Sequence, residues 1–411
     1  MPEIEVIDIA TGASSPGPTA ALSPPIRVRD LAKRFGPQVV LAGVSFDLHE
    51  GELLVVLGPS GSGKTTLLRL LAGLETAEAG EIELLGREAT SLPPQRRGFG
   101  IVFQEQALFT RMTVEQNVAF GLELRGVAAE DVRRRVDRML DLVELGADRG
   151  KYPYQLSGGM RQRVAVARAL AIRPLAMLFD EPFSGLDAIT RAELRREVRA
   201  LLQSARMPAL FITHDQEEAL ELADRIAILN EGRIEQIGTP FDVYNRPRTE
   251  FVATFLGAAN VLLGRWRSDE VTLGPLRLRP PADPPVLEDR QAVKVVFRPE
   301  DVVLNFEAPL LGTPHHLGHG VVEGVSYVGP AERLVVRLTF SPRRPTVSGR
   351  PAAADGSEVY VGGLPITVSR TKWEAGEMQL SPGDDVMVGL KDYRLLPHYP
   401  LRTEPGAKVV G

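Results

Sequence analysis

The chain has 411 residues, no cysteine and a formal net charge of −5, from 48 Lys and Arg against 53 Asp and Glu. At about 150 residues per domain, this length predicts two or three domains that each bury a hydrophobic core. The lack of cysteine excludes a disulfide scaffold, thiolate metal ligands and a cysteine nucleophile. The mildly acidic charge gives no support for a dedicated nucleic-acid binder. The sequence predicts neither a membrane-spanning helix, which needs about 18 consecutive apolar residues, nor a secretory signal.

The first 240 residues show the pattern of an α/β domain. Residues 1–25 are rich in Ser, Pro, Gly and Ala, and we expect them to form a flexible extension. Apolar and polar residues then alternate at 26–29 and 44–48, as in half-buried strands. Short apolar runs, typical of strands covered on both faces, lie at 53–57, 175–179 and 210–212.

Segments with helical periodicity separate these strands. Apolar residues recur on one helical face at 132–143, with Gly146 placed to end the helix, and again at 194–205. Because strands that alternate with helices pair in parallel, this part of the chain predicts a mainly parallel sheet.

Beyond residue 260 the helical signal gives way to short β-like runs separated by Gly, Pro and Asp. These runs lie at 293–296, 320–325, 334–340 and 385–390. Such a series predicts a small β-barrel or sandwich, with loops at 280–285 and 341–356. His315, His316 and His319 are close enough in sequence to suggest a metal site, but we interpret them as part of a polar loop.

A phosphate-binding loop is predicted at residues 58–65, which match the pattern G-x-x-x-x-G-K-[ST]. The segment follows an apolar strand and precedes a helical segment at 66–72, which is the context that the pattern requires. Its backbone N–H groups and the helix N-terminus would face phosphate oxygens. We expect Lys64 to reach the β- and γ-phosphates and the Thr65 hydroxyl to bind Mg²⁺. The expected nucleotide-binding residues of this segment are Gly58, Pro59, Ser60, Gly61, Ser62, Gly63, Lys64, Thr65 and Thr66.

An acidic pair, Asp180 and Glu181, directly follows the apolar run 175–179. A carboxylate at the carboxyl end of a parallel strand beside a phosphate loop is well placed to hold Mg²⁺, which we expect of Asp180. Glu181 points the other way along the strand and is expected to orient and deprotonate the attacking water. The alternative is an ordinary surface turn, which would be the simpler interpretation without the phosphate loop.

The segment Leu156 to Gln162 reads LSGGMRQ and resembles the signature of the ATP-binding subunits of ABC transporters. Ser157, Gly158 and Gly159 open a helical segment, and a hydroxyl with backbone amides at a helix N-terminus forms an anion site. An isolated Ser-Gly-Gly would be a linker or a helix cap. Its place between the phosphate loop and the acidic pair makes the resemblance specific.

Four further positions resemble the remaining motifs of this family. Gln104 resembles the Q-loop glutamine that contacts Mg²⁺ and water, and Asp187 belongs to a D-loop-like segment, Ser184 to Asp187. His214 resembles the switch histidine that touches the γ-phosphate, and Phe35 resembles the aromatic that stacks on adenine. Taken alone, His214 would more often be structural and Phe35 part of a core.

The resemblance covers residues 26–260 and implies an α/β P-loop NTPase cassette with a helical subdomain at about 105–170. It further implies a dimer in which the phosphate loop of one subunit and Ser157, Gly158, Gly159 and Gln162 of the other enclose each ATP. The expected catalytic residues are Glu181, His214, Lys64 and Gln104, and the expected Mg²⁺ ligands are Thr65, Gln104 and Asp180. The sequence departs from the family pattern at Met160, where Gln is commonest, and after Gln104, in a region that contacts the permease in relatives.

Residues 261–411 resemble, more loosely, the OB-like domain of ATPases that serve binding-protein-dependent importers. Gly320 to Gly329 and Ser381 to Val386 carry this resemblance. It implies a separate membrane permease, a solute-binding protein, a peripheral position on the cytoplasmic face of the inner membrane, and no nucleic-acid partner. Importers with such a tail take up sulfate or molybdate, polyamines, iron(III), phosphonates or sugars, and the resemblance favours an inorganic oxyanion or a polyamine. The alternative is a soluble ABC ATPase that acts on nucleic acid or ribosomes.

Overall fold

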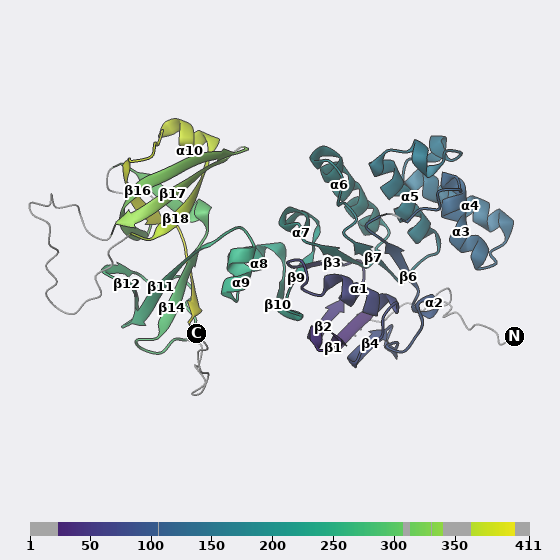
Figure 1. Cartoon of the computed structure of the whole chain (residues 1–411), viewed down its shortest axis with the longest axis horizontal. Helices are drawn as coiled ribbons and strands as arrows, with labels where there is room; N and C mark the ends of the chain where they lie inside the picture. The colour runs from purple at the N-terminus through teal and green to yellow at the C-terminus, as the bar shows by residue number, and fades with distance from the viewer. Residues whose placement is uncertain (1–23, 106, 307–312, 330, 340–362, 399–411) are drawn as a thin grey trace, which may run out of the picture. The chain divides into compact units, whose positions relative to one another are not determined.

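The computed structural model describes residues 24–105, 107–306, 313–329, 331–339 and 363–398. Almost all of the predicted extension at 1–25, and the whole of the predicted loop at 341–356, lie outside the described residues. The chain divides into two compact units between Val243 and Tyr244 (Figure 1). The predicted boundary at residue 260 lies further along the chain than this division.

A six-stranded sheet forms the centre of the first unit. Its strand order is β10-β9-β3-β8-β7-β6, and all neighbours pair in parallel except β9 with β10. The strands are β3 (Leu53–Leu57), β6 (Phe99–Val102), β7 (Ala176–Asp180), β8 (Ala209–Thr213), β9 (Arg225–Asn230) and β10 (Arg233–Gly238). All five residues of β3 and of β8 are buried, as wholly apolar parallel strands require. The predicted parallel α/β sheet is thereby confirmed.

The register of this sheet brings the predicted site residues to one edge. Leu57 of β3 pairs with Thr213 of β8, and Asp180 of β7 pairs with Ile212. The phosphate loop, Glu181 and His214 therefore all follow parallel strands that end at the same level. The helices α1 (Lys64–Ala72), α2 (Pro94–Arg97), α6 (Ala188–Ser204) and α7 (Gln216–Leu222) connect the strands.

A second sheet in the same unit is antiparallel and has the order β2-β1-β4-β5. Its strands are β1 (Ile26–Phe35), β2 (Gln38–Leu48), β4 (Ala79–Leu84) and β5 (Arg87–Glu88). Alternate residues of β1 and β2 join one core with α1 and with apolar side chains of the parallel sheet. The alternating pattern at 26–29 and 44–48 predicted the strands but not their separate sheet.

Three helices form the predicted helical subdomain, α3 (Val114–Leu124), α4 (Ala129–Leu142) and α5 (Gly158–Ala171), and Figure 1 shows them grouped together. A capping box starts α3, in which the Thr113 hydroxyl accepts from the backbone of Gln116 and the Gln116 side chain accepts from the backbone of Thr113. The short 3₁₀ turns η1 (Gly146–Asp148) and η2 (Pro153–Gln155) separate α4 from α5.

The second unit is β-rich, as predicted, and contains two five-stranded sheets of order β13-β12-β11-β14-β20 and β15-β19-β16-β17-β18. The first has β11 (Asn260–Arg267), β12 (Glu270–Leu273), β13 (Leu276–Leu278), β14 (Ala292–Phe297) and β20 (Arg394–Pro397). The second has β15 (Val302–Asn305), β16 (His315–Val328), β17 (Ala331–Thr339), β18 (Pro365–Thr371) and β19 (Asp385–Leu390). Apolar residues of both sheets share one core. The helical pieces are α9 (Glu250–Phe255), η3 (Pro299–Asp301) and α10 (Lys372–Glu377), while α8 (Pro240–Asn245) spans the division between the units.

The histidines at 315, 316 and 319 lie in strand β16, so their interpretation as a polar loop was wrong. The His315 ring is buried and meets the Tyr393 ring edge-on, with 4.8 Å between the ring centroids. A ring that packs edge-on against the buried Tyr393 ring, which directly precedes β20 of the other sheet, belongs to the packed interior. Among the described residues no helix is long and apolar enough to cross a membrane.

Candidate active site

The phosphate loop joins the end of β3 to the start of α1. Gly61 and Gly63 have φ angles of 80° and 103°, which favour glycine, and Gly63 caps α1. Gly58 is required for a different reason, because a Cβ there would lie 2.1 Å from the carbonyl oxygen of Leu229. The buried Ser62 hydroxyl has no hydrogen-bond partner among the described residues. The loop therefore offers an unpaired hydroxyl and a helix N-terminus to an anionic group.

Lys64 is the first residue of α1, and its side chain folds back under the loop. The ammonium Nζ donates to the carbonyl oxygens of Gly58 at 2.8 Å and Pro59 at 2.9 Å. The residue is only 6% exposed, and burial lowers its pKa, although the nearby charges of Glu181 and Asp180 act in the opposite direction. A phosphate in the loop would place a counter-charge in direct contact with this buried ammonium.

Asp180 ends β7 beside the phosphate loop. Its Oδ1 lies 3.5 Å from the Thr65 hydroxyl oxygen. Burial raises the pKa of Asp180, and the charge of Glu181 raises it further, against smaller opposing effects of Arg69, Thr65 and Lys64. The pair presents a hydroxyl and a carboxylate oxygen, which are hard oxygen ligands that fit Mg²⁺ together with phosphate oxygens. Gln104 is exposed and follows β6, the strand that pairs with β7.

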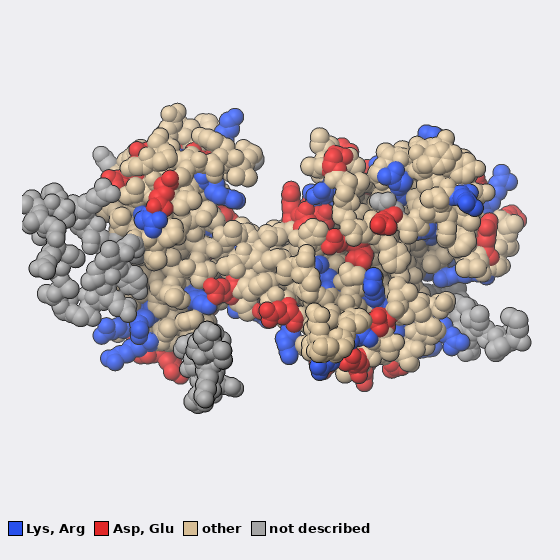
Figure 2. All heavy atoms as spheres, viewed as in Figure 1, with Lys and Arg blue, Asp and Glu red and all other residues tan. Residues whose placement is uncertain are grey.

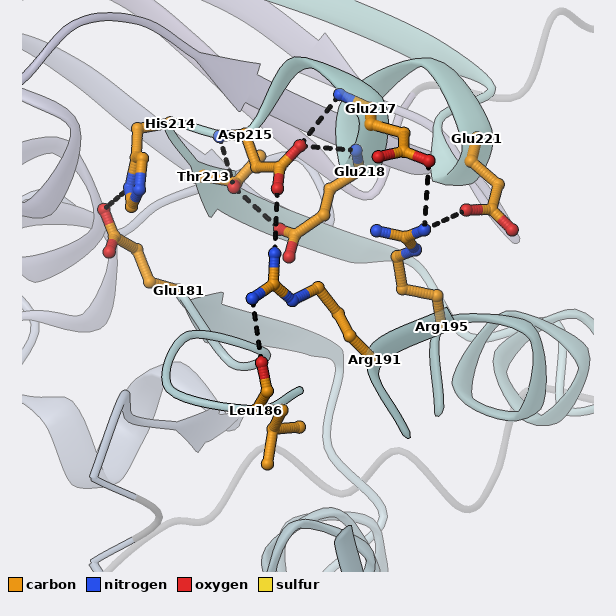
Figure 3. Close-up of polar contacts among 10 residues, drawn as sticks. All are labelled: Glu181, Leu186, Arg191, Arg195, Thr213, His214, Asp215, Glu217, Glu218 and Glu221. Atoms are coloured by element: carbon orange, nitrogen blue, oxygen red, sulfur yellow. Dashed lines mark hydrogen bonds and ion pairs between the residues drawn. The ribbon is translucent and has the colours of Figure 1, made fainter. Parts of the chain in front are cut away.

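Glu181 and His214 face each other across the edge of the sheet (Figure 3). The Nδ1 atom of His214 lies 2.9 Å from Oε1 of Glu181. Glu181 has a φ angle of 45°, a strained conformation for a residue with a Cβ, and its backbone N–H donates to the Ile212 carbonyl at 3.0 Å. The turn after β7 thus holds one carboxylate next to an imidazole, an arrangement suited to moving a proton from a water molecule.

The Ser157 segment starts α5. The Ser157 hydroxyl caps the helix by accepting from the Met160 N–H at 3.2 Å, and the residue itself is exposed. A Cβ at Gly158 would lie 2.9 Å from Leu186, and one at Gly159 would lie 3.3 Å from Thr190. Both glycines therefore allow the start of α5 to pack closely against the start of α6.

Gln162 does not fit the role predicted for it. Its side chain is 0% exposed, and neither Oε1 nor Nε2 has a hydrogen-bond partner in the part of the chain that the structure describes. It lies one turn inside α5, on the buried face, so it offers no surface to a nucleotide held by another subunit. The predicted nucleotide contact of Gln162 is corrected to an interior position.

Two more predicted residues lie at the ends of elements. Phe35 ends β1 with 49% exposure, and the Lys33 ammonium lies 5.0 Å from its ring centroid. Its exposure leaves the ring free to stack. Asp187 is exposed and caps α6, with Oδ1 accepting from the Thr190 N–H at 3.0 Å, and such hydrogen bonds lower its pKa.

Asn117 and Arg168 support the segment after Gln104, and the sequence did not single out either of them. The fully buried Asn117 side chain accepts from the Phe109 N–H at 2.9 Å and donates to the carbonyls of Phe109 and Met112, each at 3.1 Å. Arg168 of α5 donates to the Ala107 carbonyl at 2.8 Å. A lone Asn or Arg inside a helix carries no local signal for such contacts, so only the tertiary structure reveals them.

Comparison with known proteins finds relatives that match most of the chain. The ABC transporter family matches residues 41–184. The sulfate/thiosulfate import ATP-binding protein CysA of Xylella fastidiosa (strain 9a5c) is 50% identical over 320 residues, which are 77% of this chain and 89% of that protein. The protein of the same name from Nitrosomonas europaea is 41% identical over 378 residues, 91% of this chain and 98% of its own length.

The solved structure of cbiO1 from Clostridium perfringens, part of the ABC transporter complex cbiONQ, is also similar. It has a TM-score of 0.52 and 26% sequence identity, and the match covers 55% of this chain and 92% of cbiO1. The comparisons give no support to the alternative of an ATPase that acts on nucleic acid or ribosomes. The chain belongs to the ABC transporter family, as an ATP-hydrolysing, ATP-binding subunit that powers import through a separate permease.

Proposed function

We propose that this subunit hydrolyses ATP to drive the uptake of sulfate or thiosulfate. The observation that carries the proposal is the match to sulfate/thiosulfate import proteins, which in Nitrosomonas europaea extends over 98% of the relative and so includes the β-rich unit. Relatives with that name from Xylella fastidiosa and Caulobacter vibrioides are 50% and 45% identical to this chain. An oxyanion solute also agrees with the expectation from the sequence.

In this proposal the phosphate loop binds the ATP phosphates. Lys64 donates to the β- and γ-phosphate oxygens once it leaves the carbonyls of Gly58 and Pro59. The exposed Phe35 ring stacks on the adenine. The other residues of the loop, Ser60, Gly61, Ser62, Gly63, Thr65 and Thr66, supply backbone N–H groups and hydroxyls.

Mg²⁺ would be held by Thr65, Asp180 and Gln104, of which the first two already lie side by side. When bound, Mg²⁺ supplies charge neutralisation at the phosphate oxygens. Glu181 then orients the attacking water and accepts its proton at a carboxylate oxygen, and His214 donates to the γ-phosphate. Their 2.9 Å contact keeps the two groups in one place before the nucleotide arrives.

A second copy of the chain would complete each site. The exposed Ser157 hydroxyl and the amides of Gly158 and Gly159 from one subunit face the γ-phosphate held by the other, and Asp187 links the two sites. The dimer docks on a membrane permease that receives the solute from a binding protein, at the cytoplasmic face of the inner membrane. The β-rich unit serves as a transport-associated OB-like domain. On the face drawn in Figure 2, basic and acidic side chains are interspersed in both units.

Replacing Asp180 by Asn should stabilise the nucleotide-free protein and abolish Mg²⁺-dependent hydrolysis. The folded-state pKa of Asp180 is raised above 3.8, so the ionised carboxylate costs stability at neutral pH, and this cost fades as the pH falls through the folded-state pKa. We expect Asp180→Asn to raise the thermal midpoint at pH 7 by about 2 °C, with a gain that shrinks as the pH falls through the folded-state pKa of Asp180. Thermal unfolding of Asp137→Asn, which breaks the 3.0 Å pair with Arg149, is the control and should show no gain. A lower midpoint for Asp180→Asn would contradict the burial argument.

Solute uptake tests the proposed function directly. A strain that lacks this chain should lose uptake of radiolabelled sulfate and thiosulfate, and should recover it with the wild-type chain but not with Glu181→Gln. Molybdate, a polyamine and a sugar are measured in parallel. If sulfate and thiosulfate uptake is unchanged while another solute is lost, the proposed solute is wrong; if no uptake changes, the transport proposal itself fails.

A further inference from the structure

One arginine joins the turn that precedes α6 to the turn that follows β8. Arg191 lies in the first turn of α6, and its Nη2 donates to the Leu186 carbonyl at 2.9 Å. Its Nη1 donates to Oδ2 of Asp215 at 3.2 Å (Figure 3). Leu186 directly precedes Asp187, and Asp215 directly follows His214. A single planar guanidinium thus holds the neighbours of two predicted site residues.

The backbone on both sides of His214 is fixed by hydrogen bonds. The Asp215 N–H donates to the Thr213 hydroxyl oxygen at 2.9 Å, and that hydroxyl donates to Oε2 of Glu218 at 2.7 Å. Oδ1 of Asp215 caps α7 by accepting from the N–H groups of Glu217 and Glu218. The His214 side chain is exposed and contacts Glu181. Because the ring is exposed, its position depends on the hydrogen bonds that fix the backbone of Thr213 and Asp215.

A nearby cation stabilises the partly buried carboxylate of Asp215. Its side chain is only 26% exposed, and it lies close to Glu218, which is 4% exposed and whose pKa is raised by burial and by the charge of Asp215. Arg191 supplies that cation through Nη1, while its Nη2 donates to the Leu186 carbonyl. Removing the guanidinium would leave Oδ2 of this carboxylate without its ion-pair partner and would release the Leu186 carbonyl in the turn before Asp187.

Arg195, one turn further along α6, offers a matched comparison. It also ties α6 to α7, because its Nη2 lies 2.7 Å from Oε2 of Glu221 and 3.9 Å from Oε1 of Glu217. Its side chain is 5% exposed, against 30% for Arg191. In the described part of the chain, the ion pairs of Arg195 join it to Glu217 and Glu221 and not to the Leu186 carbonyl or Asp215, so Arg195 connects the two helices without bridging the two turns.

We propose that Arg191 is a positioning residue that couples the Asp187 turn to His214 by holding the Leu186 carbonyl and the Asp215 carboxylate with one guanidinium. A displacement of the Asp187 turn, at the expected contact with a second subunit, is passed through Arg191 to the backbone of His214. The inference rests on the proposed roles of Asp187 and His214.

Steady-state ATP hydrolysis by the full chain tests this role. We expect Arg191→Ala to lower kcat about tenfold with KM for ATP within about twofold of wild type, because the ring of His214 is misplaced while the phosphate loop is intact. Arg191→Lys should recover only part of kcat, since one ammonium cannot satisfy both planar contacts. Arg195→Ala should lower the thermal midpoint at least as much and leave kcat within about twofold of wild type. If Arg191→Ala does not fold, Arg191→Lys and Arg191→Gln are measured in its place.

A double-mutant cycle with His214→Ala separates coupling from general damage. If Arg191 acts through His214, adding Arg191→Ala to His214→Ala should change the single-turnover rate of radiolabelled ATP cleavage by less than about twofold. Equal kcat losses for Arg191→Ala and Arg195→Ala, or the same tenfold loss in both His214 backgrounds, would overturn the coupling role. If the wild-type chain hydrolyses no ATP, the proposed function fails instead, which makes the two failures distinguishable.

Discussion

Replacing Glu181 by Gln is expected to lower kcat for ATP hydrolysis by about 10²- to 10⁴-fold, the range that general acid–base groups contribute. The amide keeps the size of the side chain and can still donate to or accept from His214, but it cannot take a proton from water. ATP binding should be unchanged, because Lys64 and the phosphate loop are untouched. The variant should therefore accumulate as a nucleotide-bound dimer.

Phosphate release and gel filtration with ATP check this result together. Glu217→Gln is the control, since Glu217 lies on the nearby α7 and is 82% exposed, and it should keep wild-type turnover. Unchanged hydrolysis by Glu181→Gln would refute the role of Glu181 as the base. Loss of ATP binding would show instead that the substitution damages the loop.

The second large effect is expected for Lys64→Ala, which should weaken ATP binding about 10- to 100-fold and abolish hydrolysis. Lys64 is a buried ammonium whose pKa is lowered by burial, and among the described residues it donates to the carbonyl oxygens of Gly58 and Pro59. The phosphate oxygens of ATP carry negative charge, so they would bind the ammonium more strongly than neutral carbonyl oxygens do. We therefore expect much of the free energy of ATP binding to depend on Lys64.

Isothermal titration with ATP measures the loss for Lys64→Ala, with Lys151→Ala as the control. Lys151 is exposed and pairs with Asp148 outside the parallel sheet, so its loss should leave ATP affinity unchanged. Equal affinity for wild type and Lys64→Ala would contradict the assignment of the phosphate loop.

The parallel sheet, and the positions of the candidate site residues along it, could be predicted because the relevant signals are local. Buried parallel strands read as short apolar runs, and β3 is wholly buried as its sequence predicts. The residues expected to bind phosphate and to act on water follow such strands closely, so the positions of Lys64 and Glu181 at one edge of the sheet could be predicted from local patterns. The structure adds the 2.9 Å contact between Glu181 and His214, residues that are far apart in the sequence.

Other features depend on tertiary contacts and leave no trace in a local pattern. The alternation of apolar and polar residues in β1 and β2 predicts that one face of these strands is buried. It does not predict in which sheet the strands pair. Gln162 is five residues from Ser157 in the sequence, yet the periodicity of the α-helix places its side chain on the buried face of α5. The role of Arg191 depends on Asp215, which is 24 residues away in the sequence and lies beside Arg191 only in the folded chain.

The central claim is that ATP is hydrolysed between the phosphate loop of one copy and Ser157 of another. Two inactive variants test it, Lys64→Ala and Ser157→Asp, of which the second keeps a helix cap but places a negative charge toward the phosphates. In a heterodimer of the two, one site carries both changes and the other carries neither. An equimolar mixture that has exchanged subunits should therefore recover about a quarter of wild-type ATP hydrolysis, since half of the dimers then have one intact site. A mixture as inactive as either variant alone would contradict the shared site.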